Sequence, residues 1–223
     1  MDLGLVWQHR DFLLSGTITT MYMTLGAISL GALLGLIVGM ARLSRNRLVA
    51  ALAWVYVTVI RGTPMLLQIL FLFLGIPQIY VTITGQSISP DPILVGIIAL
   101  GINSGAYMGE IVRAGIQSVE KGQMEAARSL GLSHGQAMRF VILPQAIRRI
   151  IPPLANEFIV LLKDSSLVSA IGAGELMYNS RVMGAKYYAF PAFLLGAAII
   201  YLSLTMVFTH LVSRLERRLA VSD

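Results

Sequence analysis

The sequence contains no cysteine and few charged residues. The absence of cysteine excludes disulfides, thiolate catalysis and cysteine-ligated metal sites, and it leaves the redox compartment open. Charged residues make up 13% of the chain, whereas soluble domains carry about 25%. Disorder is also excluded, because a disordered chain needs many charges and few apolar residues. The hydrophobic share of 56% and the mean hydropathy of +0.76 therefore indicate a membrane protein.

The start of the chain lacks the features of a cleaved signal peptide. Its first charged residues are Asp2, Arg10 and Asp11, which form no basic n-region, and the apolar run that follows is too long for a signal peptide. We expect this segment to stay in the mature protein.

Five segments reach the length of about 20 mainly apolar residues that a transmembrane helix needs. In the first of them, Gly31, Gly35 and Gly39 are spaced by four, a pattern that lets helices approach closely. We expect one all-α transmembrane domain over residues 1–223, with five transmembrane helices at about 14–41, 49–76, 93–116, 153–171 and 188–212.

The basic residues predict the orientation. Twelve of the 17 lysines and arginines lie between the first and second spans, between the third and fourth (counting Arg113 at the end of the third), or after the fifth. Because basic residues gather on cytoplasmic loops, the N-terminus is expected outside and the C-terminus in the cytoplasm. The net charge of +6 is therefore a topology signal, and we expect no nucleic-acid partner.

Charged residues at membrane depth are costly and mark functional sites. Pro152-Pro153 suits the start of a helix, which would place Asp164 near the middle of the bilayer, and Glu157 lies seven residues earlier on the same helix face. We expect Asp164 and Glu157, with the adjacent Ser165, to line a substrate path. The alternative for Asp164 is a packing pair with Lys163.

The third span carries a polar stripe of Asn103, Tyr107 and Glu110. Such a stripe faces the bundle interior or a cavity. For Glu110 we favour a structural ion pair with Arg113, three residues later. For Tyr107 and the neighbouring Ser104, lining a cavity and bonding between helices remain open alternatives.

The second span is interrupted by Arg61-Gly62-Thr63-Pro64. Proline removes a backbone donor and breaks a helix, and transporters place such breaks at their binding sites. We expect Thr63 and Arg61 near the substrate path. Arg61 could receive a substrate carboxylate or form an ion pair with Glu110 or Asp164.

The cytoplasmic segment at about 117–149 predicts a helix–turn–helix. Residues 125–130 favour a helix, Gly131 is a plausible C-terminal cap, and Ser133 could cap a second short helix that ends before Pro144. The small side chains of the first helix, Ala126 and Ala127, would let another protein approach closely. The alternative is an amphipathic helix on the lipid surface.

The same segment resembles the EAA loop of ABC-importer permease subunits, which reads E-A-A, three residues, G, nine residues, I, any residue, L-P. Here Glu125-Ala126-Ala127, Gly131 and Leu143-Pro144 match, and Val141 replaces the isoleucine. Three further stretches resemble the glutamine and histidine permease branch, and the resemblance covers about residues 12–218. These stretches are Arg61-Gly62-Thr63-Pro64, Gly109 to Ile116, and Lys163-Asp164-Ser165-Ser166-Leu167.

This resemblance implies the transmembrane domain of a type I importer in the plasma (bacterial inner) membrane, transporting a polar amino acid. It implies two ATPase subunits, a second permease subunit that is identical or paralogous, and an extracellular solute-binding protein. Since the chain has no phosphate-binding loop of the form G-x-x-x-x-G-K-[ST], it is not the ATPase. ATP and magnesium would be bound by the partner, and no cofactor or metal by this chain. The ATPases would dock on Glu125, Ala126, Ala127, Leu130, Gly131, Leu143 and Pro144.

Two other classes of function remain as alternatives. A membrane-embedded enzyme would need a nucleophile or a metal cluster, but the histidines, His9, His134 and His210, are scattered over different segments. A non-transporting structural subunit fits poorly with an acid at membrane depth and an exposed docking loop.

Overall fold

The computed structural model describes residues 3–220, and these form helices joined by short connections, with no strand among them. In chain order the helices are α1 (Leu3–Gln8), α2 (Arg10–Arg42), α3 (Arg47–Gly62), α4 (Met65–Leu70), the π-helix η1 (Phe71–Gly75), α5 (Ile76–Thr84), α6 (Pro92–Gln117), α7 (Lys121–Ser129), α8 (His134–Ala137), the π-helix η2 (Met138–Ile142), α9 (Leu143–Asp164), the 3₁₀ helix η3 (Ser165–Ile171), α10 (Leu176–Lys186) and α11 (Phe190–Ala220).

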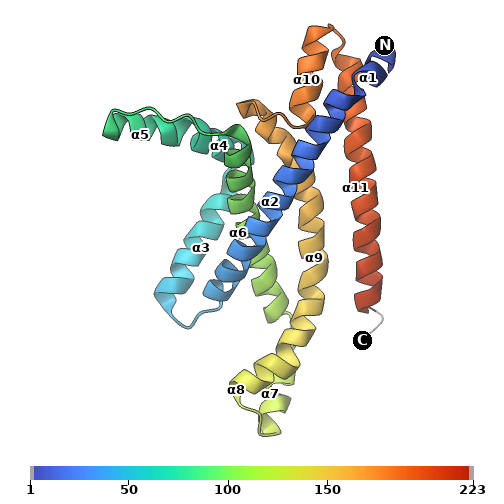
Figure 1. The fold of residues 1–223 in the computed structure, drawn as a ribbon. Coiled ribbons are helices and arrows are strands. Elements are labelled where there is room, and N and C mark those ends of the chain that lie inside the picture. The colour runs from blue at the N-terminus through green and yellow to red at the C-terminus, as the bar shows by residue number, and fades with distance from the viewer. Residues whose placement is uncertain (1–2, 221–223) are drawn as a thin grey trace.

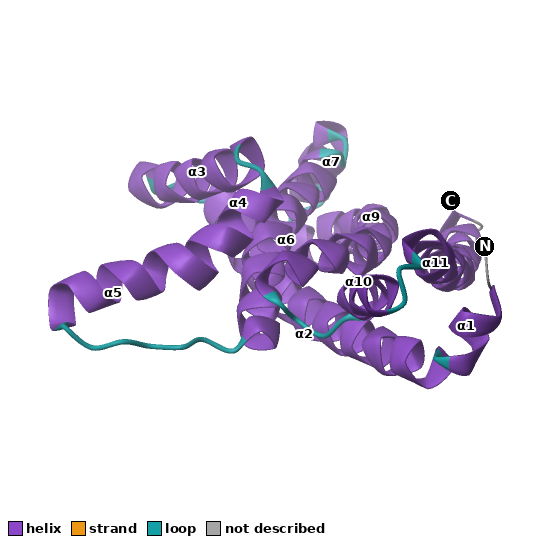
Figure 2. Cartoon of the chain, turned by 90° about the horizontal axis from the view of Figure 1, so that it is seen from above, coloured by secondary structure: helices purple, strands orange, loops and turns teal. Residues whose placement is uncertain are grey.

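Four stretches of the described chain are long and apolar enough to cross a membrane: 10–42, 65–84, 92–117 and 190–218. The long helices run along one axis (Figure 1), and the α2–α3 turn, α7, α8 and the end of α11 lie toward the same end of the molecule. Seen along that axis, α5 projects away from the other helices, and an extended loop returns from it to α6 (Figure 2).

Helices α2 and α6 pack closely through glycines. A Cβ built on Gly39 would lie 2.7 Å from Cβ of Val112, and one built on Gly31 would lie 2.9 Å from Oγ of Ser104. The contact is reciprocal, because a Cβ on Gly105 of α6 would lie 2.8 Å from Cβ of Leu34. The predicted close approach of the first helix through its glycine stripe is therefore confirmed.

The predicted second span, 49–76, is divided in the structure. Helix α3 ends at Gly62, Thr63 and Pro64 are extended, and the apolar stretch after the break continues to Thr84, eight residues beyond the predicted end. The predicted break at Pro64 is confirmed, and the two helices that it separates run in different directions (Figure 1).

Helix α9 corrects two expectations. It begins at Leu143, so Pro152 and Pro153 lie inside it and do not start it, and Asp164 lies at its end. The short helix that Ser133 caps does not end before Pro144, because α8, η2 and α9 follow one another without a gap. A π-turn precedes Pro144, and such a turn changes the backbone register without ending the helix.

The first helix of the segment at about 117–149 agrees with the sequence in most respects. α7 covers the predicted residues 125–129, Gly131 follows it with φ of +87°, and Ser133 caps α8 as expected. Ala126 is exposed, but Ala127 is buried with 4% of its surface accessible. The expectation that both alanines lie on the surface was wrong for Ala127, which lies on the buried side of α7.

Helix α10 is joined to α2 and α11 by a buried acid. Glu175 is fully buried and caps α10 by accepting hydrogen bonds from the backbone N–H groups of Met177 (2.9 Å) and Tyr178 (2.6 Å). It also accepts one from the hydroxyl of Tyr201 on α11 (2.8 Å), and Thr20 of α2 accepts a hydrogen bond from the N–H of Leu176 (3.2 Å). Polar contacts therefore join α2, α10 and α11 at the end of the molecule where α10 lies (Figure 1).

Candidate functional site

A cavity of about 310 Å³ lies between the α3–α4 break, α6 and the second half of α9. The three elements that surround it each contribute polar side chains, although they lie far apart in the sequence. The lining residues are Thr63, Met65, Leu100, Asn103, Tyr107, Glu157, Val160, Leu161 and Asp164.

Four residues that the sequence predicted for a substrate path meet at this cavity: Thr63, Tyr107, Glu157 and Asp164. The last two lie on one face of α9, as their spacing of seven predicted. Tyr107 lines the cavity, which favours the first of the two alternatives that its sequence position left open. Asn103, which we assigned only to the polar stripe, also lines it.

The two acids give the cavity its charge. No ion pair within 4.0 Å is found for Glu157 or Asp164 in the part of the chain that the structure describes, so the packing pair of Asp164 with Lys163 does not form. Glu157 accepts a hydrogen bond from the hydroxyl of Ser104 (3.2 Å). Two carboxylates in a partly apolar cavity favour a ligand with a positive charge, because opposite charges attract strongly away from bulk water.

Ser104 and Ser165 do not line the cavity. Ser104 is fully buried on α6, where its hydroxyl holds Glu157. Ser165 is fully buried too, and its hydroxyl donates to the carbonyl of Leu162 (2.8 Å), one turn earlier. Ser104 therefore positions the carboxylate of Glu157 from outside the cavity. Ser165 bonds to the backbone at the end of α9.

Arg61 lies beside the cavity, with its guanidinium carbon 4.9 Å from the centre of the Tyr107 ring. Such a position over a ring is a cation–π contact. Within residues 3–220 Arg61 forms no ion pair with Glu110 or Asp164. Arg61 is an exposed residue.

Glu110 belongs to a separate cluster of charges. It forms an ion pair with Arg113 of the same helix and a second one with Arg42 at the end of α2 (3.8 Å). The pair with Arg113 is the contact that we favoured from the sequence. The pair with Arg42 joins α2 to α6, which indicates a structural role for Glu110. Glu110 is not among the residues that line the cavity.

Sequence reasoning missed Gln68 of α4. Its side chain contacts both the break and α6, donating to the carbonyl of Ile60 (2.8 Å) and accepting from the amide of Asn103 (2.9 Å). A lone glutamine four residues after a proline gives no pattern in the sequence. Only the position of α6 reveals what this side chain does.

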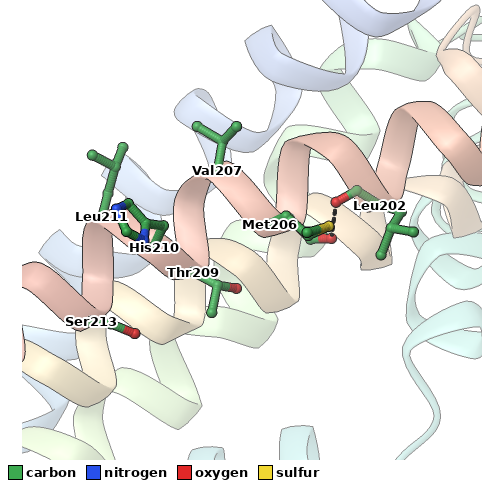
Figure 3. Close-up of a pocket in the computed structure, with 8 residues that line it drawn as sticks. Leu202, Met206, Val207, Thr209, His210, Leu211 and Ser213 are labelled. Carbon is green, nitrogen blue, oxygen red and sulfur yellow. Dashed lines mark hydrogen bonds between the residues drawn. The ribbon is translucent and has the colours of Figure 1, made fainter.

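Another hollow lies on α11 and includes His210, but all eight of its lining residues come from that one helix (Figure 3). The labelled side chains leave the helix in different directions, since Val207 and Leu211 point up in this view and Thr209 and Ser213 point down (Figure 3). A hollow with a single wall cannot surround a ligand, so the cavity between the break, α6 and α9 remains the candidate site.

The segment at about 117–149 presents a different kind of surface. Glu125, Ala126, Leu130 and Gly131 are exposed, and Leu130 has 86% of its surface accessible. Leu143 is half-buried and Pro144 is exposed. Single exposed apolar side chains are common on protein surfaces, so the sequence motif in this segment, and not the exposure of Leu130, marks it as a candidate interaction surface.

These features define a protein of long apolar helices with a cavity that two acids line and an exposed helical segment at one end. The model of a protein family described as "Binding-protein-dependent transport system inner membrane component" matches residues 31–221. The chain belongs to this family. It is therefore a membrane subunit of a transport system, and the predicted resemblance is confirmed.

Named relatives match over nearly the whole chain. The glutamine transport system permease protein GlnP of Escherichia coli K12 is 34% identical over 99% of this chain and 98% of its own length. The arginine transport system permease protein ArtQ of Bacillus subtilis is 35% identical over 100% and 99%. A solved structure described as an amino acid ABC transporter with histidines is 40% identical, with a TM-score of 0.90 over 98% of this chain and 99% of that chain.

Proposed function

We propose that this chain is the permease subunit of an ATP-binding-cassette importer that carries a polar amino acid across the bacterial inner membrane. The observation that carries the proposal is the cavity in which Glu157 and Asp164 face the α3–α4 break. The named relatives support it, since they are permeases for glutamine and arginine, and the similar structure is an amino acid transporter with histidines.

The two ends of an amino acid fit the two sides of the cavity. A substrate ammonium group binds near Asp164 and Glu157 on α9, because neither acid forms an ion pair within 4.0 Å among the described residues. The substrate carboxylate lies toward the break, where the Arg61 guanidinium is placed beside the Tyr107 ring. The hydroxyl of Tyr107 is available as a further hydrogen-bond partner.

This arrangement predicts which side chains are accepted. A neutral polar or cationic side chain is compatible with two nearby carboxylates, whereas an anionic side chain is repelled and would lose its hydration without compensation. Glutamate and aspartate are therefore poor substrates, although they resemble glutamine and asparagine in size.

The chain crosses the membrane five times, with its N-terminus outside and its C-terminus in the cytoplasm. The crossings are α2, α3, α6, α9 and α11, which run along one axis, whereas α4 and α5 run across it (Figure 1). Helix α9 is the crossing that carries the most charge. A charged helix is compatible with a bilayer when its charges face a cavity. The basic turn between α2 and α3 lies at the same end as α7 and α8 (Figure 1), which supports a common cytoplasmic side.

The energy enters from partner subunits. Two ATPases, which bind ATP and magnesium, dock on the surface that includes Glu125, Leu130 and Gly131, and a solute-binding protein delivers the substrate from outside. A second permease subunit, identical or paralogous, completes the pathway. Closure of the ATPases moves α7 and, through the continuous helix from α8 to α9, shifts the two acids between outward and inward access.

Uptake into proteoliposomes that contain the complete complex tests the proposal. Asp164→Asn should lower uptake about 10- to 100-fold, because a hydrogen bond to a charged group contributes about 1.5–3 kcal/mol. The matched control is Asp11→Asn, since Asp11 is a largely exposed acid on α2, far along the sequence from the cavity.

In the same assay, excess unlabelled arginine, histidine or glutamine should compete with the substrate better than glutamate does. The proposal is wrong if the wild-type complex shows no ATP-dependent uptake of any polar amino acid. Wild-type uptake by Asp164→Asn would remove Asp164 from the site while leaving the permease assignment intact.

A further inference from the structure

The α3–α4 break leaves the carbonyl of Ile60 without its helical hydrogen-bond donor, because the residue four positions later is a proline. In a continuous helix the carbonyl of Ile60 would accept a hydrogen bond from the N–H of residue 64. That residue is Pro64, which has no N–H. An unpaired carbonyl away from water costs about 1–3 kcal/mol, so the break needs a donor from elsewhere.

Gln68 supplies this donor. Its Nε2 lies 2.8 Å from the Ile60 carbonyl oxygen, 2.8 Å from the hydroxyl of Thr63 and 3.2 Å from the Thr63 carbonyl oxygen. The hydroxyl of Thr63 in turn donates to the carbonyl of Val59 (2.9 Å). The side chain of Gln68 thus replaces the missing N–H and holds Thr63 at the same time.

The chemistry fixes the orientation of the Gln68 amide. Carbonyl oxygens only accept, so the end of the amide that faces Ile60 and Thr63 must be the nitrogen. The oxygen therefore faces α6, where it accepts a hydrogen bond from Nδ2 of Asn103 (2.9 Å). Only an amide carries out both tasks in this orientation.

Gln68 lies behind the wall of the cavity. Thr63 and Asn103 line the cavity of about 310 Å³, whereas Gln68 lines a separate apolar groove of about 420 Å³ on the other side of Thr63. Gln68 therefore does not reach the substrate directly. It acts through the two cavity residues to which it is bonded.

We propose that Gln68 is a positioning residue, which fixes the α3–α4 break on α6 and so sets the width of the substrate cavity between Thr63 and the acids of α9. This inference rests on the proposed function for its effect on transport. Its effect on the break itself does not depend on what the cavity binds. When Gln68 holds the break, movement of α9 changes access to a cavity of defined size. Without the hydrogen bonds of Gln68 the break moves, the cavity changes size, and ATP hydrolysis is uncoupled from transport.

Two substitutions separate the parts of this role. Gln68→Glu keeps the length and the acceptor for Asn103, but it places a carboxylate oxygen against the carbonyls of Ile60 and Thr63. Gln68→Met keeps the length and removes both the donor and the acceptor. Gln78→Glu is the matched control, because Gln78 is an exposed glutamine on α5, in the same apolar stretch after the break.

The first measurement is hydrogen–deuterium exchange of the intact complex in lipid. Amides of residues 63–70 should exchange about tenfold faster in Gln68→Glu and Gln68→Met, which corresponds to about 1.4 kcal/mol. Gln78→Glu should exchange like the wild type. Asn103→Ala tests the same link from α6 and should also speed exchange in residues 63–70, which keeps the inference testable if a Gln68 variant fails to assemble.

The second measurement is the amount of amino acid transported per ATP hydrolysed. Both Gln68 variants should lower this ratio about tenfold, while stimulation of the ATPase by the loaded binding protein stays within about twofold of wild type, because a wall that yields uncouples transport without blocking docking.

Wild-type exchange in residues 63–70 of the variants overturns the positioning role, whatever the complex transports. Faster exchange with a wild-type transport ratio overturns the link to the cavity. A wild-type complex that transports no amino acid contradicts the proposed function instead, and the exchange data then still decide whether Gln68 holds the break.

Discussion

The substitution Gly39→Ala tests whether close contact between α2 and α6 stabilises the molecule. A Cβ at this position would lie 2.7 Å from Cβ of Val112 and 2.9 Å from the carbonyl oxygen of Gly109. Neither neighbour can give way easily, because valine is stiff at χ1 and the carbonyl belongs to the backbone of α6. The helices must therefore separate by about 1 Å to reach the usual contact distance of about 3.5–4.0 Å.

The cost follows from two opposing contributions. Overpacking of a well-packed contact costs about 1–3 kcal/mol, and rigid neighbours place Gly39 at the upper end of that range. Alanine returns about 1 kcal/mol through its better helix propensity. The net destabilisation is about 2 kcal/mol, which changes the unfolding equilibrium about 30-fold.

Unfolding of the purified protein in mixed detergent micelles, with increasing denaturing detergent or temperature, measures this change. A loss of about 2 kcal/mol should lower Tm by about 4–8 °C for a chain of this size. Gly26→Ala is the control on the same helix, because its Cβ would meet only the side chain of Ile97, at 3.1 Å or more. If Gly39→Ala unfolds at the same temperature as Gly26→Ala, the glycine contact does not determine the α2–α6 spacing.

Three further predictions concern other parts of the molecule. Gly131→Val should abolish ATP-coupled uptake without preventing membrane insertion, because φ of +87° excludes a β-branched residue. Gly131→Asn should retain uptake, and equal uptake by the two variants would refute the argument. Glu175→Ala should destabilise the protein by about 3 kcal/mol in detergent unfolding, since it removes the cap of α10 and leaves buried donors unpaired, and Glu175→Gln should lose less. Tyr56→Phe should cost about 1 kcal/mol in the same assay, because the hydroxyl of Tyr56 donates to the carbonyl of Ile102 on α6 (2.5 Å), and an unchanged stability would show that this bond contributes nothing.

Local patterns in the sequence were sufficient for several elements. The spacing of Gly31, Gly35 and Gly39 predicted a close helix contact, Pro64 predicted a break, and Gly131 predicted the end of a helix. Each of these depends on a property of the residue itself: a missing Cβ, a missing N–H or access to positive φ. Such properties act within a few residues, so a single sequence reveals them.

The same kind of local rule failed at Pro144, Pro152 and Pro153. Proline was expected to end or begin a helix at these positions, but the helix from α8 to α9 passes through all three. The π-helix η2 lies just before Pro144 and provides a different hydrogen-bond register there. Gln145 donates a side-chain hydrogen bond to the carbonyl of Val141 (2.9 Å), which adds to the backbone bonding in this stretch.

For the candidate site, the sequence identified the acids but not their surroundings. The spacing of Glu157 and Asp164 placed both on one helix face, and charge in an apolar segment marked them as functional. The spacing could not show that Ser104 bonds to Glu157, or that Arg61 lies over Tyr107. These contacts join residues about 50 positions apart, and no local pattern encodes them.

By itself, the sequence determined that the chain lies in a membrane, that a polar break interrupts one helix and that two acids share a helix face, because composition and periodicity express solvation and helix geometry directly. The tertiary structure alone decided that the break, α6 and α9 enclose one cavity, that Glu175 is buried among three helices, and that Gln68 replaces the N–H that Pro64 lacks. The physical reason is that a side-chain amide finds its partners only after the helices have packed. The scarcity of charge is thus a property of the sequence, whereas the partners of the few polar groups are a property of the fold.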